Sequence, residues 1–345
     1  MNIRLITTAN QIHLDSDTVL VLGYFDGLHL GHQELFKKAR QIADEKGLKV
    51  ALLTFPESPK LAFVRYRPEL LLHLQSPEDR FQKLKELGLS KEEWRRAYQF
   101  LFMKAAQTEP LQANHQFTPD AIGFIITFLI DQLAKGDQLD VLEVGSGTGN
   151  LAETIVNNSR LTIDYLGLEV DDLLIDLSAS IADVMESSVV FAQGDAVRPQ
   201  VLKESDLIVS DLPIGYYPDD TIAQRYQVAS TEEHTYAHHL MMEQALKYLK
   251  PQGVAIFLAP NNLLTSPQSD LLKTWLKDKA QILAMLTLPE SLFSNPAYAK
   301  TIFVLRKQEE ESVQPFVYPF TDLQDQDQVV HFMESFQNWL MDSEI

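Results

Sequence analysis

The sequence predicts an α/β protein with a seven-stranded, mostly parallel sheet, preceded by a smaller α/β unit. Apolar strand-like runs alternate with amphipathic helical segments through most of the chain, and glycines follow the first strand of two separate units. At 345 residues the chain is too long for one ordinary core. Its 45% hydrophobic and 22% charged residues are typical of a soluble globular protein.

The first unit begins with an apolar, β-branched run at 18–25, which is typical of a buried strand. A helix is predicted over 32–47, a second strand over 49–55, and a further helix over 77–88 behind the capping residue Ser76. Proline and glycine residues end these elements. We therefore expect a strand–helix–strand unit in this part of the chain.

The longer second unit opens with two helices. The first runs from a capping-box sequence at Ser90 to about Gln107, and the second, strongly apolar helix is opened by Thr118 and Pro119. Strands are predicted over 139–144, 163–169, 188–193, 205–211, 253–259, 281–288 and 301–306. Helices are predicted near 149–158, 171–185, 235–250, 267–278 and 326–341. Because strands alternate with helices, crossover connections and a parallel sheet are expected.

Acidic charge is concentrated in the second unit. The first 90 residues carry 12 basic and 11 acidic side chains, which leaves 17 basic and 37 acidic ones in the remainder. Affinity for nucleic acids depends mainly on the neutralisation of phosphates by Lys and Arg. A nucleic acid or nucleobase-containing substrate is therefore disfavoured by the charge unless a local basic groove exists.

The composition also bounds the chemistry. The chain contains no cysteine, which excludes disulfides, a thiolate nucleophile and cysteine-ligated metals. His234 and His238 are four residues apart, but the spacing assigns no carboxylate to the same face, so a role in capping or lining a helix is preferred and no metal site is predicted. No apolar run reaches the roughly 20 residues that cross a bilayer. We expect a cytoplasmic protein that contacts no membrane.

The sharpest motif is a glycine-rich turn at the end of the first strand of the second unit. Glu143 precedes a loop of Gly145, Ser146, Gly147 and Gly149 that leads into a helix. Glycines are needed where a ligand lies against the bare backbone at the carboxyl end of a strand. An acid before the glycines would repel a pyrophosphate and attract a positively charged group. This predicts a ligand with a cationic end.

Acidic residues follow the next two strands as well. Glu169 is placed to accept hydrogen bonds from the two hydroxyls of a ribose, and Asp195 to accept one from an adenine amino group. With the glycine loop, they make residues 91–308 resemble the class I S-adenosylmethionine-dependent methyltransferases. The resemblance implies a Rossmann-like methyltransferase sheet with a reversed final strand at 301–307 and S-adenosyl-L-methionine as the cofactor. The segment QFTP at 116–119 resembles the one that precedes the donor site in adenine methylases.

The fourth strand ends in a degenerate acceptor motif. Amino-group methylases carry Asn or Asp, two prolines and an aromatic residue there, and the side chain and a backbone carbonyl accept hydrogen bonds from the target amino group. Here Asp211 and Pro213 match, Leu212 replaces the first proline, and an isoleucine replaces the aromatic residue. Tyr216 or Tyr217 is expected to supply the missing ring, which stacks on a base flipped out of a duplex.

A second motif lies in the first unit, where two histidines precede a helix whose N-terminus favours phosphate. Its residues are Gly23, Phe25, Asp26, Gly27, His29, Gly31 and His32. The motif resembles the start of bacterial FAD synthetase, the FMN adenylyltransferase of the bifunctional riboflavin kinase, and implies ATP and FMN as ligands. The resemblance stops near Gly88, before the flavin-binding half of that family, so the nucleotidyltransferase-like α/β unit is expected to be partial.

These observations predict four segments and three competing functions. The segments are a partial FAD synthetase-like unit (1–89), a helical connection (90–117), a methyltransferase domain (118–308) and an acidic tail with a helix (309–345). The second unit resembles N6-adenine DNA methylase-like proteins of the YtxK type, which favours a methyltransferase acting on an amino nitrogen. The alternatives are FMN adenylylation by the first unit and a catalytically silent protein that binds the methyl donor.

Overall fold

A computed structural model describes residues 18–22, 30–53, 86–106, 117–293, 295–307 and 313–343. The chain divides into two compact units, Met1–Trp94 with Asp183–Met185, and Arg95–Ala182 with Glu186–Ile345. None of the helices in the described ranges is long and apolar enough to span a membrane.

The smaller unit contains the predicted strand–helix–strand arrangement. Strand β1 (Thr18–Leu22) pairs in parallel with β2 (Lys49–Leu53), and α1 (Leu30–Lys46) connects them. Gly47 has a φ of +65°, a left-handed conformation that ends the helix at little cost for glycine. Most of the helix predicted over 77–88 lies outside the described residues.

The helix α5 (Lys91–Ala106) begins at the predicted capping box. The hydroxyl of Ser90 accepts a hydrogen bond from the backbone N–H of Glu93, and the Glu93 carboxylate accepts one from the backbone N–H of Ser90. These reciprocal bonds satisfy donors that a helix N-terminus leaves without partners. The boundary read from the sequence is thus confirmed.

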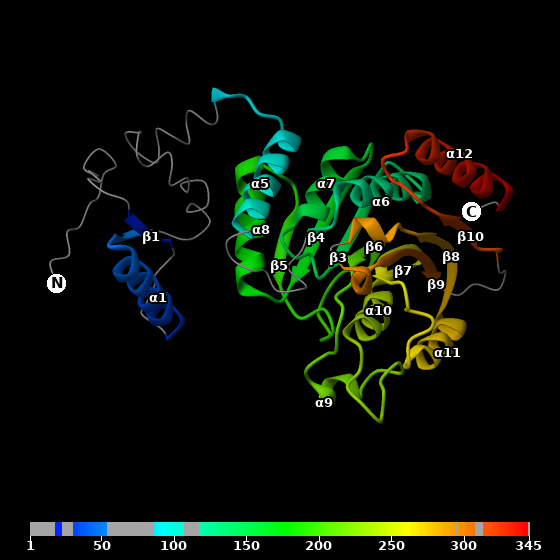
Figure 1. The fold of residues 1–345 in the computed structure, drawn as a ribbon. Coiled ribbons are helices and arrows are strands. Elements are labelled where there is room, and N and C mark those ends of the chain that lie inside the picture. Colours follow the sequence, from blue (N-terminus) through cyan, green and yellow to red (C-terminus); the bar gives the residue numbers. More distant parts are fainter. Residues whose placement is uncertain are drawn as a thin grey trace. The chain divides into compact units, whose positions relative to one another are not determined.

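The larger unit is built on a mixed sheet in which β9 is antiparallel to both its neighbours and all other pairs are parallel. Its order is β10-β8-β9-β7-β6-β3-β4-β5 (Figure 1). The strands are β3 (Gln138–Val144), β4 (Thr162–Glu169), β5 (Val190–Gln193), β6 (Ser205–Asp211), β7 (Leu249–Pro260), β8 (Ala280–Thr287), β9 (Lys300–Lys307) and β10 (Phe316–Pro319). The reversed strand implied at 301–307 is β9.

The prediction of seven strands is wrong, because the sheet has eight. The additional strand, β10, pairs in parallel with β8 and forms one edge of the sheet. Only four residues long, it is too short for an alternating pattern to stand out in the sequence. The following helix, α12 (Gln326–Ser343), buries Phe332 and Phe336 completely in the same core as the central strands.

Helices cover both faces of the sheet (Figure 1). One face packs against α6 (Asp120–Leu133), α7 (Asn150–Asn158) and α12, and the opposite face against α10 (Ala237–Lys247) and α11 (Ser269–Lys279). The short α9 (Asp220–Ala223) and the longer α8 (Asp172–Met185) complete the described helices of this unit. Burial on both faces explains why most residues of the central strands β6 and β7 are buried, rather than alternately buried and exposed.

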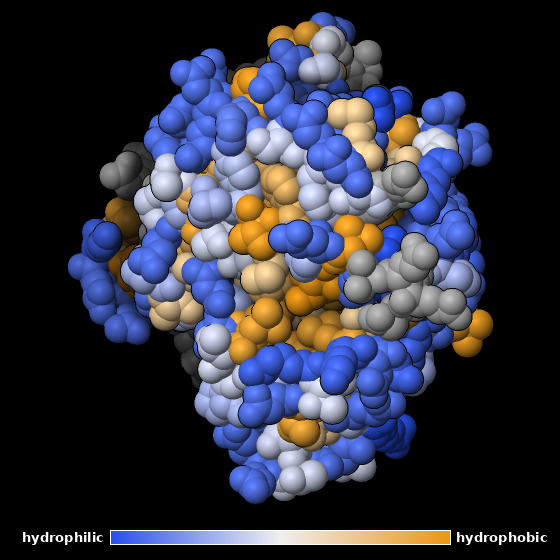
Figure 2. All heavy atoms as spheres, turned by 90° about the vertical axis from the view of Figure 1, so that its right-hand side faces the viewer, coloured by the Kyte–Doolittle hydropathy of each residue, from blue (hydrophilic) through white to orange (hydrophobic). Residues whose placement is uncertain are grey.

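Figure 2 shows the face of the larger unit that lies on the right in Figure 1. Apolar residues gather near its middle and are bordered by hydrophilic ones. The edge strand β10 belongs to this side of the unit, and its Val317 side chain is 62% exposed. The sequence motifs are located at the carboxyl ends of β3, β4 and β6.

Candidate functional site

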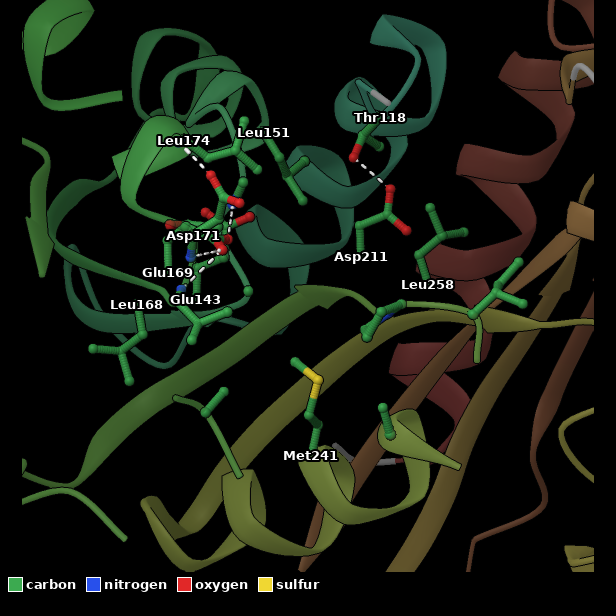
Figure 3. A pocket seen from close by; sticks show the side chains of 18 of the residues that line it. Thr118, Glu143, Leu151, Leu168, Glu169, Asp171, Leu174, Asp211, Met241 and Leu258 are labelled. Atoms are coloured by element: carbon green, nitrogen blue, oxygen red, sulfur yellow. Dashed lines mark hydrogen bonds between the residues drawn. The ribbon is translucent and has the colours of Figure 1, made fainter. Parts of the chain in front are cut away.

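A cavity of about 770 Å³ lies where β3, β4 and β6 end (Figure 3). Ligands of open α/β sheets bind at the carboxyl ends of the strands, since the loops there diverge and leave a crevice. The predicted residues that line this cavity are Glu143, Gly145, Ser146, Gly147, Glu169, Asp195, Asp211 and Pro213. Parallel pairing of β3 with β4 and β6 thus brings together acids that are far apart in the sequence.

The glycine loop follows β3 and leads into α7. Gly145, Gly147 and Gly149 all have left-handed backbones, with φ of +73°, +54° and +76°. A side chain at Gly149 would place its Cβ 2.7 Å from the Phe191 ring, whereas a Cβ at Gly147 would meet no atom within 4 Å. Glycine is therefore needed at Gly149 for packing and at Gly147 for the backbone conformation, and the loop at Gly147 stays open to the cavity.

Glu143, at the end of β3, is 1% exposed and accepts a hydrogen bond of 2.9 Å from the Tyr165 hydroxyl. Burial raises the pKa of Glu143 well above its usual value, and the nearby carboxylates of Asp211 and Glu169 raise it further. A cation placed in the cavity would favour the charged form of this carboxyl. The cavity is therefore suited electrostatically to a positively charged ligand.

Glu169, at the end of β4, is held by the backbone. Its Oε2 accepts from the N–H of Gly147 at 2.7 Å, and its Oε1 accepts from the N–H groups of Val170 and Asp171. These bonds fix the carboxylate beside the glycine loop, as the close-up of the cavity shows (Figure 3). Carboxylate oxygens have lone pairs to spare after such contacts, so Glu169 can still accept hydroxyl groups of a ligand.

Asp195, in the turn after β5, is fixed by a tyrosine that also lines the cavity. Its Oδ2 accepts from the Tyr217 hydroxyl at 2.6 Å, and its Oδ1 accepts from the N–H of Val197. Burial, together with the bond to Asp195, raises the pKa of Tyr217 to about 12, so this hydroxyl stays protonated and donates. Asp195 is thus oriented by a residue of the loop between β6 and α9 (212–219), called the acceptor loop here because it carries the degenerate acceptor motif.

Asp211 ends β6 and has both carboxylate oxygens occupied by other side chains. Its Oδ2 accepts from the Thr118 hydroxyl at 2.7 Å (Figure 3), and its Oδ1 accepts from the Lys300 ammonium. Lys300 also donates to the Leu212 carbonyl at 2.8 Å. The Leu212 side chain is fully buried in the core, so only its backbone can take part in a site.

Sequence reasoning missed the contacts made by Thr118 and Lys300. The sequence predicts that Thr118 and Pro119 open α6. The N-cap is Pro119, and the hydroxyl of Thr118 donates to Asp211. The resemblance of QFTP to a segment before a donor site was the available signal. No local sequence pattern indicates that Lys300 contacts Asp211, because the position of Lys300 depends on how β9 pairs with β7.

The two tyrosines of the acceptor loop lie differently. Tyr217 lines the cavity, whereas Tyr216 is not among the described residues that do. The Tyr216 ring is 52% exposed and stacks on Tyr236, with ring centroids 4.9 Å apart and an angle of 10° between the planes. Of the two tyrosines named from the sequence, Tyr217 is therefore the one that contributes to the cavity lining.

Two histidines of α10, His238 and His239, are buried, and one of them contacts the acceptor loop. His238, 4% exposed, contacts the Pro213 carbonyl, and His239 is fully buried. Burial lowers the pKa of His238 to about 4 and that of His239 to about 3, so both are neutral near pH 7. His234 is exposed and pairs with Asp220 at 2.9 Å. Over the ranges described, no group of three or more His, Cys, Asp or Glu is placed to hold a metal.

The histidine motif of the first unit falls mostly outside the described residues. This applies to Gly23, Phe25, Asp26, Gly27 and His29. Gly31 and His32 lie in the first turn of α1. The ATP and FMN contacts implied for them therefore stay predictions.

Comparison with known proteins gives two family matches. Residues 90–343 match the family described as N-6 DNA Methylase, and residues 11–100 match the family described as FAD synthetase. YtxK of Bacillus subtilis, described as uncharacterized, is 34% identical over 242 residues, which are 68% of this chain and 73% of YtxK. A bifunctional riboflavin kinase/FMN adenylyltransferase of Listeria monocytogenes is 43% identical over 75 residues. These residues are 22% of this chain and 24% of that enzyme.

Solved structures resemble the larger unit. A Listeria monocytogenes protein assigned to the class I S-adenosylmethionine-dependent methyltransferases is 29% identical, with a TM-score of 0.71 over 81% of this chain and 88% of that one. A methyltransferase subunit of a type I restriction-modification system from Streptococcus thermophilus has a TM-score of 0.52 at 12% identity. It covers 65% of this chain and 53% of that subunit. The second likeness shows the fold alone.

Proposed function

Because this chain belongs to the N-6 DNA Methylase family, we propose that residues 118–308 form a domain that binds S-adenosylmethionine and transfers its methyl group to an amino nitrogen of a nucleobase or similar group. The observation that carries the proposal is the meeting of two sets of groups in one cavity. One set, around the glycine loop, suits the donor, and the other, at the end of β6, suits an amino group.

The residues around the glycine loop fit the donor. Glu143 supplies negative charge for a ligand with a cationic amino-acid end, and Glu169 supplies oxygens for ribose hydroxyls. The carboxylate of Asp195 faces the same cavity and suits an adenine amino group. When bound, S-adenosylmethionine supplies a methyl group on a sulfonium sulfur, which makes its carbon electrophilic. The protein's part is then to hold the two reactants in line.

The end of β6 suits the acceptor. An amino nitrogen is a better nucleophile when its N–H groups donate to acceptors that withdraw no electron density from it. The Asp211 carboxylate and the Leu212 carbonyl are such acceptors. After transfer the nitrogen carries an extra proton, and a carboxylate can receive it. We propose that Tyr217 or Pro213, which line the cavity, contacts the flat face of the acceptor.

The chemical class of the acceptor rests on family relationships. Proteins of similar fold include methyltransferase subunits of type I restriction-modification systems, which supports a nucleobase as acceptor. The excess of acidic residues in the larger unit works against unaided binding to duplex DNA. We therefore propose that the acceptor is a nucleobase in a single strand or a small molecule, or is delivered by a basic partner.

Calorimetric titration with S-adenosylmethionine tests the donor part. We expect binding by the wild-type chain and loss of binding by Gly147→Arg, because a long side chain at this open, left-handed position would enter the cavity. Gly88→Arg is the matched control, since Gly88 has a φ of +60° and equally open surroundings but lies in the smaller unit. Equal donor binding by Gly147→Arg and wild type would show that the loop is misassigned.

Methylation separates an enzyme from a silent donor-binding protein. Labelled S-adenosylmethionine is supplied with single-stranded and duplex DNA, RNA and a cell extract, and the labelled product is isolated. We expect N-methylated adenine and its loss in Asp211→Ala. Donor binding without any labelled product would favour the silent alternative.

A second candidate function rests on the match of residues 11–100 to FAD synthetases. The chain spans 24% of the bifunctional relative, so we propose that its FMN site is incomplete. Incubation with ATP and FMN is then expected to yield no FAD. FAD formed by the wild-type chain but not by a His29→Ala, His32→Ala variant would establish FMN adenylylation instead.

A further inference from the structure

The Lys300 ammonium contacts the same two groups that are proposed to bind the amino nitrogen of a methyl acceptor. This residue begins β9, which is antiparallel to β7, and Pro260 is its partner in the register. Its ammonium reaches the carboxylate of Asp211 and lies 2.8 Å from the carbonyl oxygen of Leu212. These two groups, the acceptor cradle, are the ones proposed to hold an amino nitrogen.

No acceptor atom of the cradle is left without a donor. Thr118 donates to Oδ2 of Asp211, and Lys300 donates to Oδ1 and to the Leu212 carbonyl. An ammonium has three N–H donors and an aromatic amine has two. Lys300 therefore presents the cradle with the same chemistry as the amino group of a substrate. The two nitrogens cannot occupy one position at the same time.

Burial makes this contact stronger than a surface ion pair. The Lys300 side chain is 13% exposed and that of Asp211 is 22% exposed, although both line the cavity. Hydrogen bonds to charged groups are stronger than neutral ones, and those shielded from water are stronger still. An incoming neutral amine thus competes with a charged, tethered donor for the same oxygens.

From this geometry we propose that Lys300 is an internal occupant of the acceptor cradle, and that an amino-group acceptor binds only when the Lys300 ammonium leaves it. The inference rests on the proposed function and makes Lys300 a specificity-determining residue. The backbone of Lys300 is fixed by its pairing in the sheet, so displacement is a rotation of the flexible side chain. An amine binds the cradle only if its contacts with the rest of the cavity are strong enough to displace the Lys300 ammonium, so amines that make weak contacts there do not bind.

The test compares two oligodeoxynucleotides in the presence of S-adenosylhomocysteine. One carries a single adenine in a single strand, and the other carries purine, which lacks the amino group, at that position. Binding is measured by fluorescence anisotropy at low salt. We expect the wild-type chain to bind both equally within a factor of two, and Lys300→Met to prefer adenine about tenfold, because the cradle is then free.

Lys307→Met is the matched control. Lys307 lies on the same strand and donates to the Leu249 carbonyl, and it is not among the residues that line the cavity. We expect it to behave as the wild type. A Lys300→Met chain that binds S-adenosylmethionine normally but has no preference for adenine would overturn the inference. So would a wild-type chain that already prefers adenine as strongly as Lys300→Met does.

Failure of the proposed function is recognised separately, since a wild-type chain that binds no S-adenosylmethionine refutes the donor site.

One measurement needs no variant and so does not depend on the folding of Lys300→Met. A crystal structure of the wild type with S-adenosylhomocysteine should keep Lys300 Nζ within hydrogen-bond distance of both Asp211 and the Leu212 carbonyl. A Lys300 side chain turned away from both in that crystal would contradict its role as occupant.

Discussion

The hydroxyl of Thr118 lies 2.7 Å from Oδ2 of Asp211, a residue 93 positions further along the chain. Thr118 precedes α6, and Asp211 ends β6, so the contact joins the segment before the sheet to the acceptor cradle (Figure 3). The Thr118 carbonyl in turn accepts from Asn150, whose side-chain oxygen accepts from Arg95. A chain of hydrogen bonds thus runs from α5 to the carboxyl end of β6.

Replacement of Thr118 by Val should weaken this connection. Valine has the same shape but no hydroxyl, so Oδ2 of Asp211 loses its donor and the free energy of unfolding should fall by about 1 kcal/mol. Urea denaturation measures the change. Thr118→Ser keeps the hydroxyl and should remain within about 0.5 kcal/mol of wild type. If Thr118→Val is as stable as Thr118→Ser, the hydrogen bond contributes nothing to stability.

Arg95 should contribute more, because it is 1% exposed and donates to both Asp120 and Asn150. Arg95→Met keeps the apolar stem but removes the charge. Asp120 then loses its ion pair, although Gln99 still donates to it, and the buried side-chain oxygen of Asn150 loses the Arg95 donor. We expect a loss of about 2 kcal/mol in the free energy of unfolding. Arg96→Met, at the exposed neighbouring position, is the control, and thermal and urea unfolding are the measurements. A loss equal to that of the control would contradict a structural role for Arg95.

We expect Glu143 to lower the free energy of unfolding at pH 7 and to strengthen the binding of S-adenosylmethionine. Burial raises its pKa, so above the ordinary carboxyl pKa the folded chain retains a proton that the unfolded chain has lost. The contribution of Glu143 to the free energy of unfolding is therefore largest at low pH and falls as pH rises. Glu143→Gln, which removes the titration, should be more stable than wild type at pH 7 but not at pH 4. It should also bind S-adenosylmethionine about tenfold more weakly.

The measurements for Glu143 are urea denaturation at both pH values and calorimetry at pH 7. Glu290 is not among the described residues that line the cavity, and Glu290→Gln is the control variant. A Glu143→Gln chain that binds the donor as tightly as wild type would remove Glu143 from the proposed donor site.

For the buried His239 we expect the free energy of unfolding to depend on pH in the opposite sense to that expected for Glu143. Burial lowers the pKa of His239 to about 3, so between pH 6.5 and pH 3 the unfolded chain binds a proton that the folded chain does not. The free energy of unfolding should therefore fall as pH falls, by about 2 to 3 kcal/mol between pH 6.5 and pH 4.5 for this residue. His239→Leu should flatten that part of the profile. The exposed His234 supplies the control variant His234→Ala. This variant should show the same fall in the free energy of unfolding between pH 6.5 and pH 4.5 that is attributed to His239.

Much of the fold could be predicted because its signals are local. The glycine loop, the strand ends at Glu143, Glu169 and Asp211, and the reversed β9 each follow from a short pattern or a resemblance carried by one. The capping box at Ser90 is another such case. β10 was missed because a strand of four residues in an acidic segment carries too few alternating positions to be distinguished from a loop.

Local sequence patterns do not indicate which of Tyr216 and Tyr217 faces the cavity. Tyr216 forms an antiparallel bridge with Tyr236 and stacks on its ring. Because successive side chains of an extended backbone point to opposite sides, the neighbouring Tyr217 turns into the cavity. The pairing partner is 20 residues away in the sequence, and nothing in the motif itself indicates which side faces the site.

By itself, then, the sequence determined the order of strands and helices apart from β10, the glycine loop and the acids at or just after the ends of β3, β4, β5 and β6, since each depends on neighbours in the chain. Only the tertiary structure decided what those acids contact. Thr118 and Lys300 reach Asp211 because the segment before α6, the last residue of β6 and the first residue of β9 meet at the same end of the strands, although β7 lies between β6 and β9 in the sheet. Hydrogen bonds form between groups that are close in space, and closeness across 89 or 93 residues follows from strand order and packing rather than from any local pattern.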